Sequence, residues 1–131
     1  MAHDRQSGTV LVVDDNADIR GLAKVFLEKA GYAVVMAGDG EEGFRAYQEH
    51  RASIVMLLTD VVMPNMGGLE LADRVLEMDS ELVVLFMSGD TRCDYRESEC
   101  LAKPFRPAEL IETVNRVLQA TTHSERASSA A

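Results

Sequence analysis

The stretch Val10-Leu11-Val12-Val13-Asp14-Asp15, four apolar residues followed by two acids, decides the fold of this 131-residue chain. Two similar apolar runs occur at residues 54–58 and 82–87. Unbroken apolar runs of this kind are typical of central strands in a parallel sheet that is covered by helices on both faces. Amphipathic stretches alternate with the runs, which is the pattern of repeated βαβ units. The sequence therefore predicts an α/β fold.

Residue spacing and end signals predict the remaining elements. These are two shorter strands at residues 33–37 and 99–102, and four helices at residues 19–30, 41–50, 69–76 and 107–118. Asp15 or Asn16 is available to cap the first helix, and Gly31 to end it. Residues 89–98 carry no clear apolar stripe, so we expect at most one or two helical turns there.

The composition indicates one soluble globular domain. Hydrophobic residues make up 47% of the chain and charged residues 27%, which is ordinary for a folded protein. The formal net charge is -9, and the 13 Lys and Arg residues are scattered, so direct contact with nucleic acid is not expected. We expect residues 9–120 to form the domain, residues 1–8 to be flexible, and residues 121–131 to be a disordered tail or linker.

The sequence carries no predicted export or membrane signal. The polar N-terminus lacks the apolar stretch of a secretory signal, and no apolar run approaches the ~20 residues that span a bilayer. The two cysteines, Cys93 and Cys100, are expected to be free thiols, as in a reducing compartment. We therefore expect a cytoplasmic chain.

Polar side chains follow the predicted central strands. Asp14, Asp15, Asp60 and Ser88 all stand at or just beyond strand ends, and the carboxyl ends of parallel strands meet in one crevice. Three carboxylates that converge there would raise one another's pKa unless a positive charge neutralises them. Lys103 and a hard divalent cation are the candidates, and Mg²⁺ prefers one or two carboxylates together with water and phosphate oxygens. The sequence therefore predicts a site where a phosphoryl group can bind.

Four motifs together resemble the response regulator receiver domain, over about Thr9 to Ala120. They are Leu11-Val12-Val13-Asp14-Asp15, Thr59-Asp60-Val61-Val62-Met63-Pro64, Met87-Ser88-Gly89 and Lys103-Pro104-Phe105. The resemblance implies a flavodoxin-like, doubly wound sheet of five parallel strands in the order 2-1-3-4-5. Residues 59–63 and 86–89 are most similar to the C-terminal receivers of hybrid sensor histidine kinases. Two-component phosphorelay signalling is the function that the resemblance implies.

The resemblance also implies a role for each acid. Asp60 would be the phosphoacceptor, and its carboxylate would attack the phosphorus of a phosphohistidine on a histidine kinase or histidine phosphotransfer protein. Mg²⁺, or Mn²⁺, would be held by Asp15 and Asp60 with the backbone carbonyl of Val62, and by Asp14 directly or through water. The aspartyl phosphate formed in this way would switch the conformation of the domain.

Lys103 and Ser88 would bind the phosphoryl oxygens, and Ser88 would also be a switch residue. The resemblance implies a cis peptide bond between Lys103 and Pro104, which aims the lysine inward. Val62 and Asp90, each two positions beyond a site residue, are expected to tune the lifetime of the phosphorylated state.

Two features depart from the family pattern. Cys100 occupies the position where many receivers have an aromatic switch residue. The interval from Ser88 to Lys103 is also shorter than is usual by ~7 residues, or about two helical turns, so we expect a shortened or missing fourth helix. Both departures fall on the surface that the family commonly uses for output.

Three other functions compete with the phosphoaccepting receiver. A flavin-binding electron carrier would share the fold, but Asp14-Asp15-Asn16 would repel a flavin phosphate. An aspartyl phosphatase would need a second acid where Val62 follows Asp60. A phosphorylation-independent receiver that acts as a constitutive protein-interaction module stays open as the alternative. In either case the chain is expected not to be an enzyme beyond its own phosphorylation and slow autodephosphorylation, and to be a monomer or weak dimer, alone or within a hybrid kinase.

Overall fold

A five-stranded parallel sheet forms the centre of the structure, a computed structural model that describes residues 8–89 and 100–130, with side chains up to Ala120. Its strands are β1 (Thr9–Val13), β2 (Ala33–Ala37), β3 (Ile54–Asp60), β4 (Val83–Ser88) and β5 (Cys100–Ala102). Their order is β2-β1-β3-β4-β5 and every neighbouring pair is parallel. The predicted fold class and strand order are confirmed.

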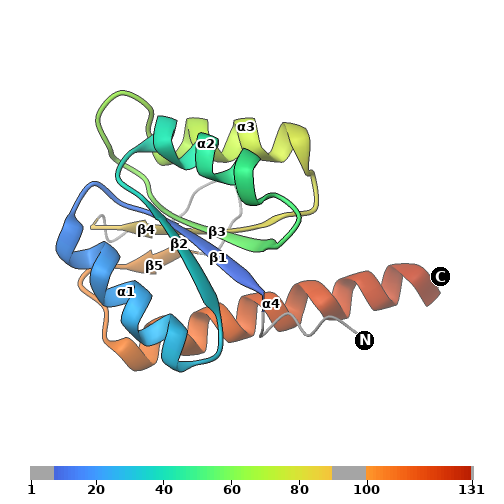
Figure 1. Ribbon diagram of the computed structural model, residues 1–131. Coiled ribbons are helices and arrows are strands. Elements are labelled where there is room, and N and C mark those ends of the chain that lie inside the picture. The colour runs from blue at the N-terminus through green and yellow to red at the C-terminus, as the bar shows by residue number, and fades with distance from the viewer. Residues whose placement is uncertain (1–7, 90–99, 131) are drawn as a thin grey trace.

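Four helices cover the two faces of the sheet. They are α1 (Ala17–Lys29), α2 (Gly40–His50), α3 (Gly68–Met78) and α4 (Pro107–Ala130). Figure 1 shows α2 and α3 on one side of the sheet, and α1 and α4 on the other. The buried side chains accordingly form two clusters, one on each face. Every residue of β1 is buried, because this central strand is covered on both sides, and this explains its unbroken apolar run.

A polar cap starts α1 close to the end of β1. The side chain of Asn16 accepts hydrogen bonds from the backbone N–H groups of Asp18 and Ile19 and so caps α1. Gly31 follows the end of α1 with a φ of 104°, a conformation that favours glycine. One of the two predicted caps, Asn16, is therefore the N-cap, and α1 begins only a few residues beyond the acids that follow β1.

The last helix is longer than predicted. It continues to Ala130, where we expected a disordered tail or linker from residue 121, and Figure 1 shows it projecting beyond the sheet. Residues 121–130 contain neither glycine nor proline, so the sequence has no signal that ends the helix there. The absence of an apolar period was therefore a poor guide to where the helix stops.

Cys100, the first residue of β5, departs from one expectation. Cys100 is disulfide-bonded, so the prediction of a free thiol was wrong for this residue. Spacing along the sequence does not say whether a fold brings two sulfur atoms within bonding distance. Cys93, Asp90 and the expected shortened fourth helix lie outside the described residues. Among the described helices, none is long and apolar enough to cross a bilayer.

Tyr47 on α2 carries a buried polar atom without a partner. Its side chain is fully buried, and its hydroxyl makes no hydrogen bond among the described residues. Burial, together with the negative charge of Asp79, raises the pKa of this phenol. The Arg51 guanidinium opposes the rise. An unpaired buried hydroxyl costs free energy in the folded state.

Replacing Tyr47 with Phe is expected to raise the free energy of unfolding by about 1 kcal/mol, because the unpaired hydroxyl is removed. Urea denaturation measures the change. Tyr32→Phe is the matched control, since the Tyr32 hydroxyl donates to Asn115 Oδ1 at 2.5 Å, and it is expected to lower the free energy of unfolding by about 1 kcal/mol. A loss of stability in both variants would contradict this account of Tyr47.

Candidate functional site

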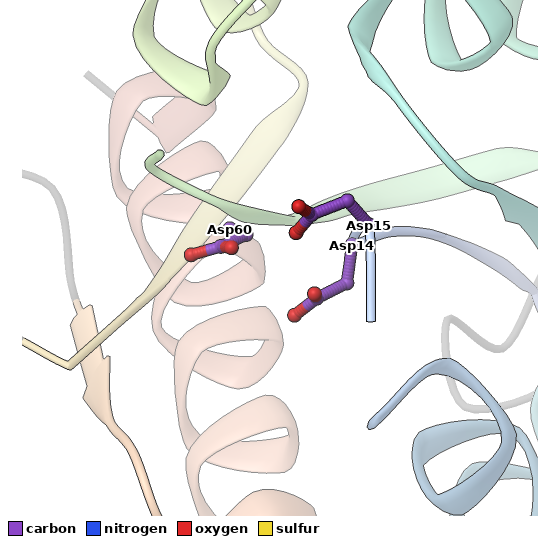
Figure 2. Close-up of side chains that lie close together, drawn as sticks. All are labelled: Asp14, Asp15 and Asp60. Atoms are coloured by element: carbon purple, nitrogen blue, oxygen red, sulfur yellow. The ribbon is translucent and has the colours of Figure 1, made fainter. Parts of the chain in front are cut away.

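Three carboxylates meet where β1 and β3 end. One oxygen each from Asp14, Asp15 and Asp60 lies within 4.8 Å of the other two, and Figure 2 shows the group. The register explains the meeting: Val13 pairs with Thr59 across the parallel strands, so the next residues of the two strands emerge side by side. The convergence predicted from the strand ends is therefore present.

The three acids differ in exposure and in partners. Asp14 is fully buried: its Oδ2 accepts a hydrogen bond from Lys103 Nζ at 2.8 Å, and its Oδ1 accepts one from the Asn16 backbone N–H at 2.9 Å. Asp60 is 9% exposed, and its Oδ2 lies 3.4 Å from Lys103 Nζ. Asp15 is exposed. Lys103 therefore stands between the two buried acids and compensates their charge.

Burial and the neighbouring charges set the protonation of the group. Burial is the main cause that raises the pKa of Asp60, with Asp14 and Asp15 adding to the rise, while the ammonium of Lys103 opposes it. Burial acts to lower the pKa of Lys103, but the hydrogen bond to Asp14 and the charges of Asp14 and Asp60 outweigh it and raise that pKa. Lys103 therefore stays positively charged at neutral pH.

The donor set fits a hard divalent cation. Three carboxylates against one ammonium leave two negative charges in excess when all are ionised, and all ligand atoms in the group are oxygens. Mg²⁺ selects such oxygen ligands and keeps part of its water shell. Asp15 and Asp60 have exposed surface from which to reach an ion. The residues present thus suit the predicted Mg²⁺ or Mn²⁺, with Asp14 already engaged by its protein partners.

The end of β4 and the turn after β5 bring Ser88 and Lys103 to the same edge. The backbone N–H of Lys103 donates to the Ser88 carbonyl at 2.8 Å. Asp60 at the end of β3 pairs with Met87 of β4, so the next residue of β4, the buried Ser88, lies close to Asp60. The Lys103–Pro104 peptide bond is cis, which is the isomer that the resemblance implies.

The loop after β3 holds contacts that sequence reasoning missed. A Cβ placed on Gly68 would lie 2.0 Å from the backbone carbonyl oxygen of Asp60. The Gly68 N–H also donates to the Val61 carbonyl at 2.9 Å. The adjacent glycines Gly67 and Gly68, seven and eight residues after Asp60, were the available signal for this close approach. The start of α3 therefore packs against the backbone of Asp60.

The structure gives the exposure of two other predicted residues, Val62 and Cys100, and shows a contact of Arg20, which was not predicted. The Val62 side chain is 79% exposed beside the site, while the metal-binding role of its carbonyl stays a prediction. Cys100 lies half-buried on β5, paired with Phe86 of β4. Arg20 was not singled out from the sequence, although its guanidinium reaches the Asp14 carbonyl.

Replacing Asp60 with Asn is expected to stabilise the fold, raising Tm at neutral pH by about 3–5 °C. A carboxyl whose pKa is raised on folding from its ordinary value of 3.8 contributes stability below that value and loses it as pH rises through the folded pKa. The increase in Tm of Asp60→Asn over the unsubstituted protein should therefore be small at acidic pH and should grow as the pH rises.

Thermal melts across pH in Mg²⁺-free buffer measure this difference. Asp18→Asn, the same change at an exposed position in the first turn of α1, is the control and should show no such gain. A Tm difference for Asp60→Asn that shrinks as pH rises would contradict the assigned direction of the Asp60 pKa.

Comparisons with known proteins agree with this geometry. The family model of the response regulator receiver domain matches residues 10–115. The response regulator receiver protein CpdR of Brucella abortus (strain 2308) is 35% identical over 116 residues, which cover 83% of this chain and 95% of CpdR. The chain spans about half the length of other curated relatives, such as the probable transcriptional regulator ycf27 of Guillardia theta, 32% identical over 86% of this chain and 46% of that protein.

Solved structures show the same fold. The receiver domain from hybrid histidine kinase CckA is 32% identical, with a TM-score of 0.76 over 85% of this chain and 99% of that one. The chemotaxis response regulator CheY4 of Vibrio cholerae is 31% identical, with a TM-score of 0.77 over 84% of this chain and 98% of that one. With the family model matching most of its length, the chain belongs to the response regulator receiver domains of two-component systems.

Proposed function

We propose that Asp60 accepts a phosphoryl group from a phosphohistidine and that the resulting aspartyl phosphate switches the domain. The observation that carries the proposal is the approach of Lys103 Nζ to within 3.4 Å of Asp60 Oδ2 inside a cluster of three carboxylates. A carboxylate oxygen of Asp60 attacks phosphorus, an O–P bond forms, the N–P bond to the donor imidazole breaks, and the imidazole leaves with the electron pair of that bond.

The distribution of partners favours Asp60 over the other two acids as the nucleophile. Both carboxylate oxygens of Asp14 already accept hydrogen bonds, and Asp14 has no exposed surface. Asp15 is the exposed member and suits a metal ligand. The Asp60 side chain keeps 12% of its surface exposed and has the charged amine beside it, so a phosphoryl oxygen bound there would meet a positive group at once.

A divalent cation, Mg²⁺ or Mn²⁺, would be held by Asp15 and Asp60 with the Val62 carbonyl, near Asp14, and would neutralise charge on the transferring phosphoryl group. Lys103 would bind one phosphoryl oxygen and the Ser88 hydroxyl another. Ser88 would thereby report the phosphoryl group to the side of the sheet formed by β4 and β5.

The surface beside the site suits a protein donor. Val62, two residues after Asp60, is 79% exposed, and α1, which begins two residues after Asp15, exposes Leu22 and Val25 to 40% and 48%. Exposed apolar side chains next to a reactive group favour docking of another protein. We propose a histidine kinase or histidine phosphotransfer protein as this partner, and a signalling role without other catalysis. The net charge of -9 disfavours nucleic acid as a partner.

We place the chain in the cytoplasm as a monomer or weak dimer, either as a separate regulator or within a hybrid kinase. The disulfide at Cys100 is the observation against a reducing compartment, where disulfides are rare. The domain boundaries at residues 9 and 120 and the tuning roles of Val62 and Asp90 stay predictions.

Incubation with acetyl phosphate and Mg²⁺, followed by intact-protein mass spectrometry, tests the proposed function. We expect the mass to increase by one phosphoryl group, and we expect no increase with a chelator or in Asp60→Asn. Asp18→Asn, the matched control, should be phosphorylated as in the unsubstituted protein. If no phosphoryl group is taken up, even from a phosphorylated histidine kinase, the alternative of a phosphorylation-independent interaction module replaces this proposal.

A further inference from the structure

Arg20 links α1 to the strand end that carries two of the three acids. Its Nη1 donates a hydrogen bond to the backbone carbonyl oxygen of Asp14 at 2.7 Å. Arg20 lies in the first turns of α1, six residues beyond the carbonyl that it binds. Its side chain therefore folds back over the turn that contains Asp15 and Asn16.

The path of this guanidinium is confined on its other side. A Cβ placed on Gly38 would lie 3.3 Å from Arg20 Nη1, so the glycine after β2 leaves the room that the guanidinium occupies. The Gly38 N–H donates to Glu42 Oε1 at 2.9 Å, which fixes that loop to α2. The guanidinium is thus held between the ends of β1 and β2.

The bonded carbonyl belongs to the same planar peptide unit as the Asp15 N–H. Because the six atoms of a peptide unit lie in one plane, fixing the Asp14 oxygen fixes the direction in which Asp15 Cα leaves the turn. The Asp15 carboxylate accepts no hydrogen bond from another residue among residues 8–89 and 100–120. Its position near Asp14 and Asp60 therefore depends on the backbone that carries it.

We propose that Arg20 is a positioning residue for the metal site: its hydrogen bond to the Asp14 carbonyl orients the peptide that carries Asp15, so that Asp15 reaches a divalent cation. This inference rests on the proposed function only for the presence of that cation. Arg20 does not touch the cation or the phosphoryl group. It acts through the backbone in the way that outer partners orient metal ligands.

Charge and positioning predict opposite effects at Arg20, which makes the proposal testable. If Arg20 acted only through its positive charge, it would repel a cation from the site, and its removal would strengthen Mg²⁺ binding. If it positions Asp15, removal weakens Mg²⁺ binding despite the lost repulsion. We expect Arg20→Gln to raise the Mg²⁺ dissociation constant about tenfold.

Isothermal titration calorimetry of the full chain with Mg²⁺ measures this constant. Arg20→Lys keeps the charge and one possible donor, so its Mg²⁺ dissociation constant should lie between those of Arg20→Gln and the unsubstituted protein. Arg74→Gln is the matched control for loss of one positive charge, since Arg74 pairs with Glu70 on α3, where both side chains are about half exposed. It should leave the dissociation constant unchanged. Thermal melts with chelator verify that each variant is folded.

A second measurement separates positioning from chemistry. The Mg²⁺ concentration for half-maximal phosphorylation by acetyl phosphate should rise about tenfold in Arg20→Gln, while the rate at saturating Mg²⁺ stays near that of the unsubstituted protein. Equal or tighter Mg²⁺ binding by Arg20→Gln would overturn the inference and leave the proposed function intact. If the unsubstituted protein bound no Mg²⁺, the metal part of the proposed function would fall, and the inference with it.

Discussion

Replacing Lys103 with Met is expected to lower the free energy of unfolding by about 3 kcal/mol in Mg²⁺-free buffer. Asp14 is fully buried, and Lys103 donates a hydrogen bond to it at 2.8 Å. Met retains much of the apolar stem and removes the charge, so the variant leaves a buried carboxylate beside Asp60 without its cation. Removing one partner of a buried ion pair is costly for this reason.

Saturating Mg²⁺ is expected to return part of this loss, because a bound divalent cation supplies positive charge to the same carboxylates. Urea denaturation with chelator and with Mg²⁺ measures both values. Lys24→Met is the control: the Lys24–Glu28 pair is 38% and 45% exposed, and its loss should change stability by less than about 0.5 kcal/mol. Equally small decreases in the free energy of unfolding of the two variants would show that Lys103 does not compensate the charge of Asp14.

Replacing Gly68 with Ala is expected to lower the free energy of unfolding by about 2–3 kcal/mol and to slow phosphorylation of Asp60. The added Cβ would lie 2.0 Å from the Asp60 carbonyl oxygen, a backbone atom that can move only if the end of β3 moves with it. The same displacement shifts the acceptor relative to Lys103. Urea denaturation and the rate of acetyl phosphate labelling measure the two effects.

Gly21→Ala provides the matched control for this glycine. Gly21 lies inside α1, and a Cβ placed there meets nothing within 4 Å. Because alanine has a higher helix propensity than glycine, the free energy of unfolding of this variant should rise by about 0.5–1 kcal/mol. An unchanged stability and labelling rate in Gly68→Ala would mean that α3 can move away from the acceptor without consequence.

The central strands and the acids that follow them were readable from the sequence because both depend on local pattern. β1 is buried on both faces, so its apolar run is unbroken, and parallel strands necessarily bring Asp14 and Asp60 to one edge. The cap of α1 was predictable to one of two residues, Asp15 or Asn16, because the side chain of the true cap, Asn16, bonds only to the next turn.

Contacts that depend on packing and on the path of the chain were not readable. The approach of Gly68 to the Asp60 carbonyl depends on how α3 packs against β3, and no periodicity records it. The hydrogen bond from Arg20 to the Asp14 carbonyl joins a side chain to a backbone oxygen, which any residue type could supply. The disulfide at Cys100 likewise depends on the path of the chain, not on the spacing of two cysteines.

The central claim is that Asp60, among three clustered carboxylates, carries the phosphoryl group. Borohydride reduction of the protein after treatment with acetyl phosphate and Mg²⁺ converts the phosphorylated aspartate to homoserine, and peptide mapping by mass spectrometry locates it. The account predicts homoserine at Asp60 and unmodified aspartate at Asp14 and Asp15. Homoserine at Asp14 or Asp15, or a phosphoryl group that remains on Ser88, would contradict it.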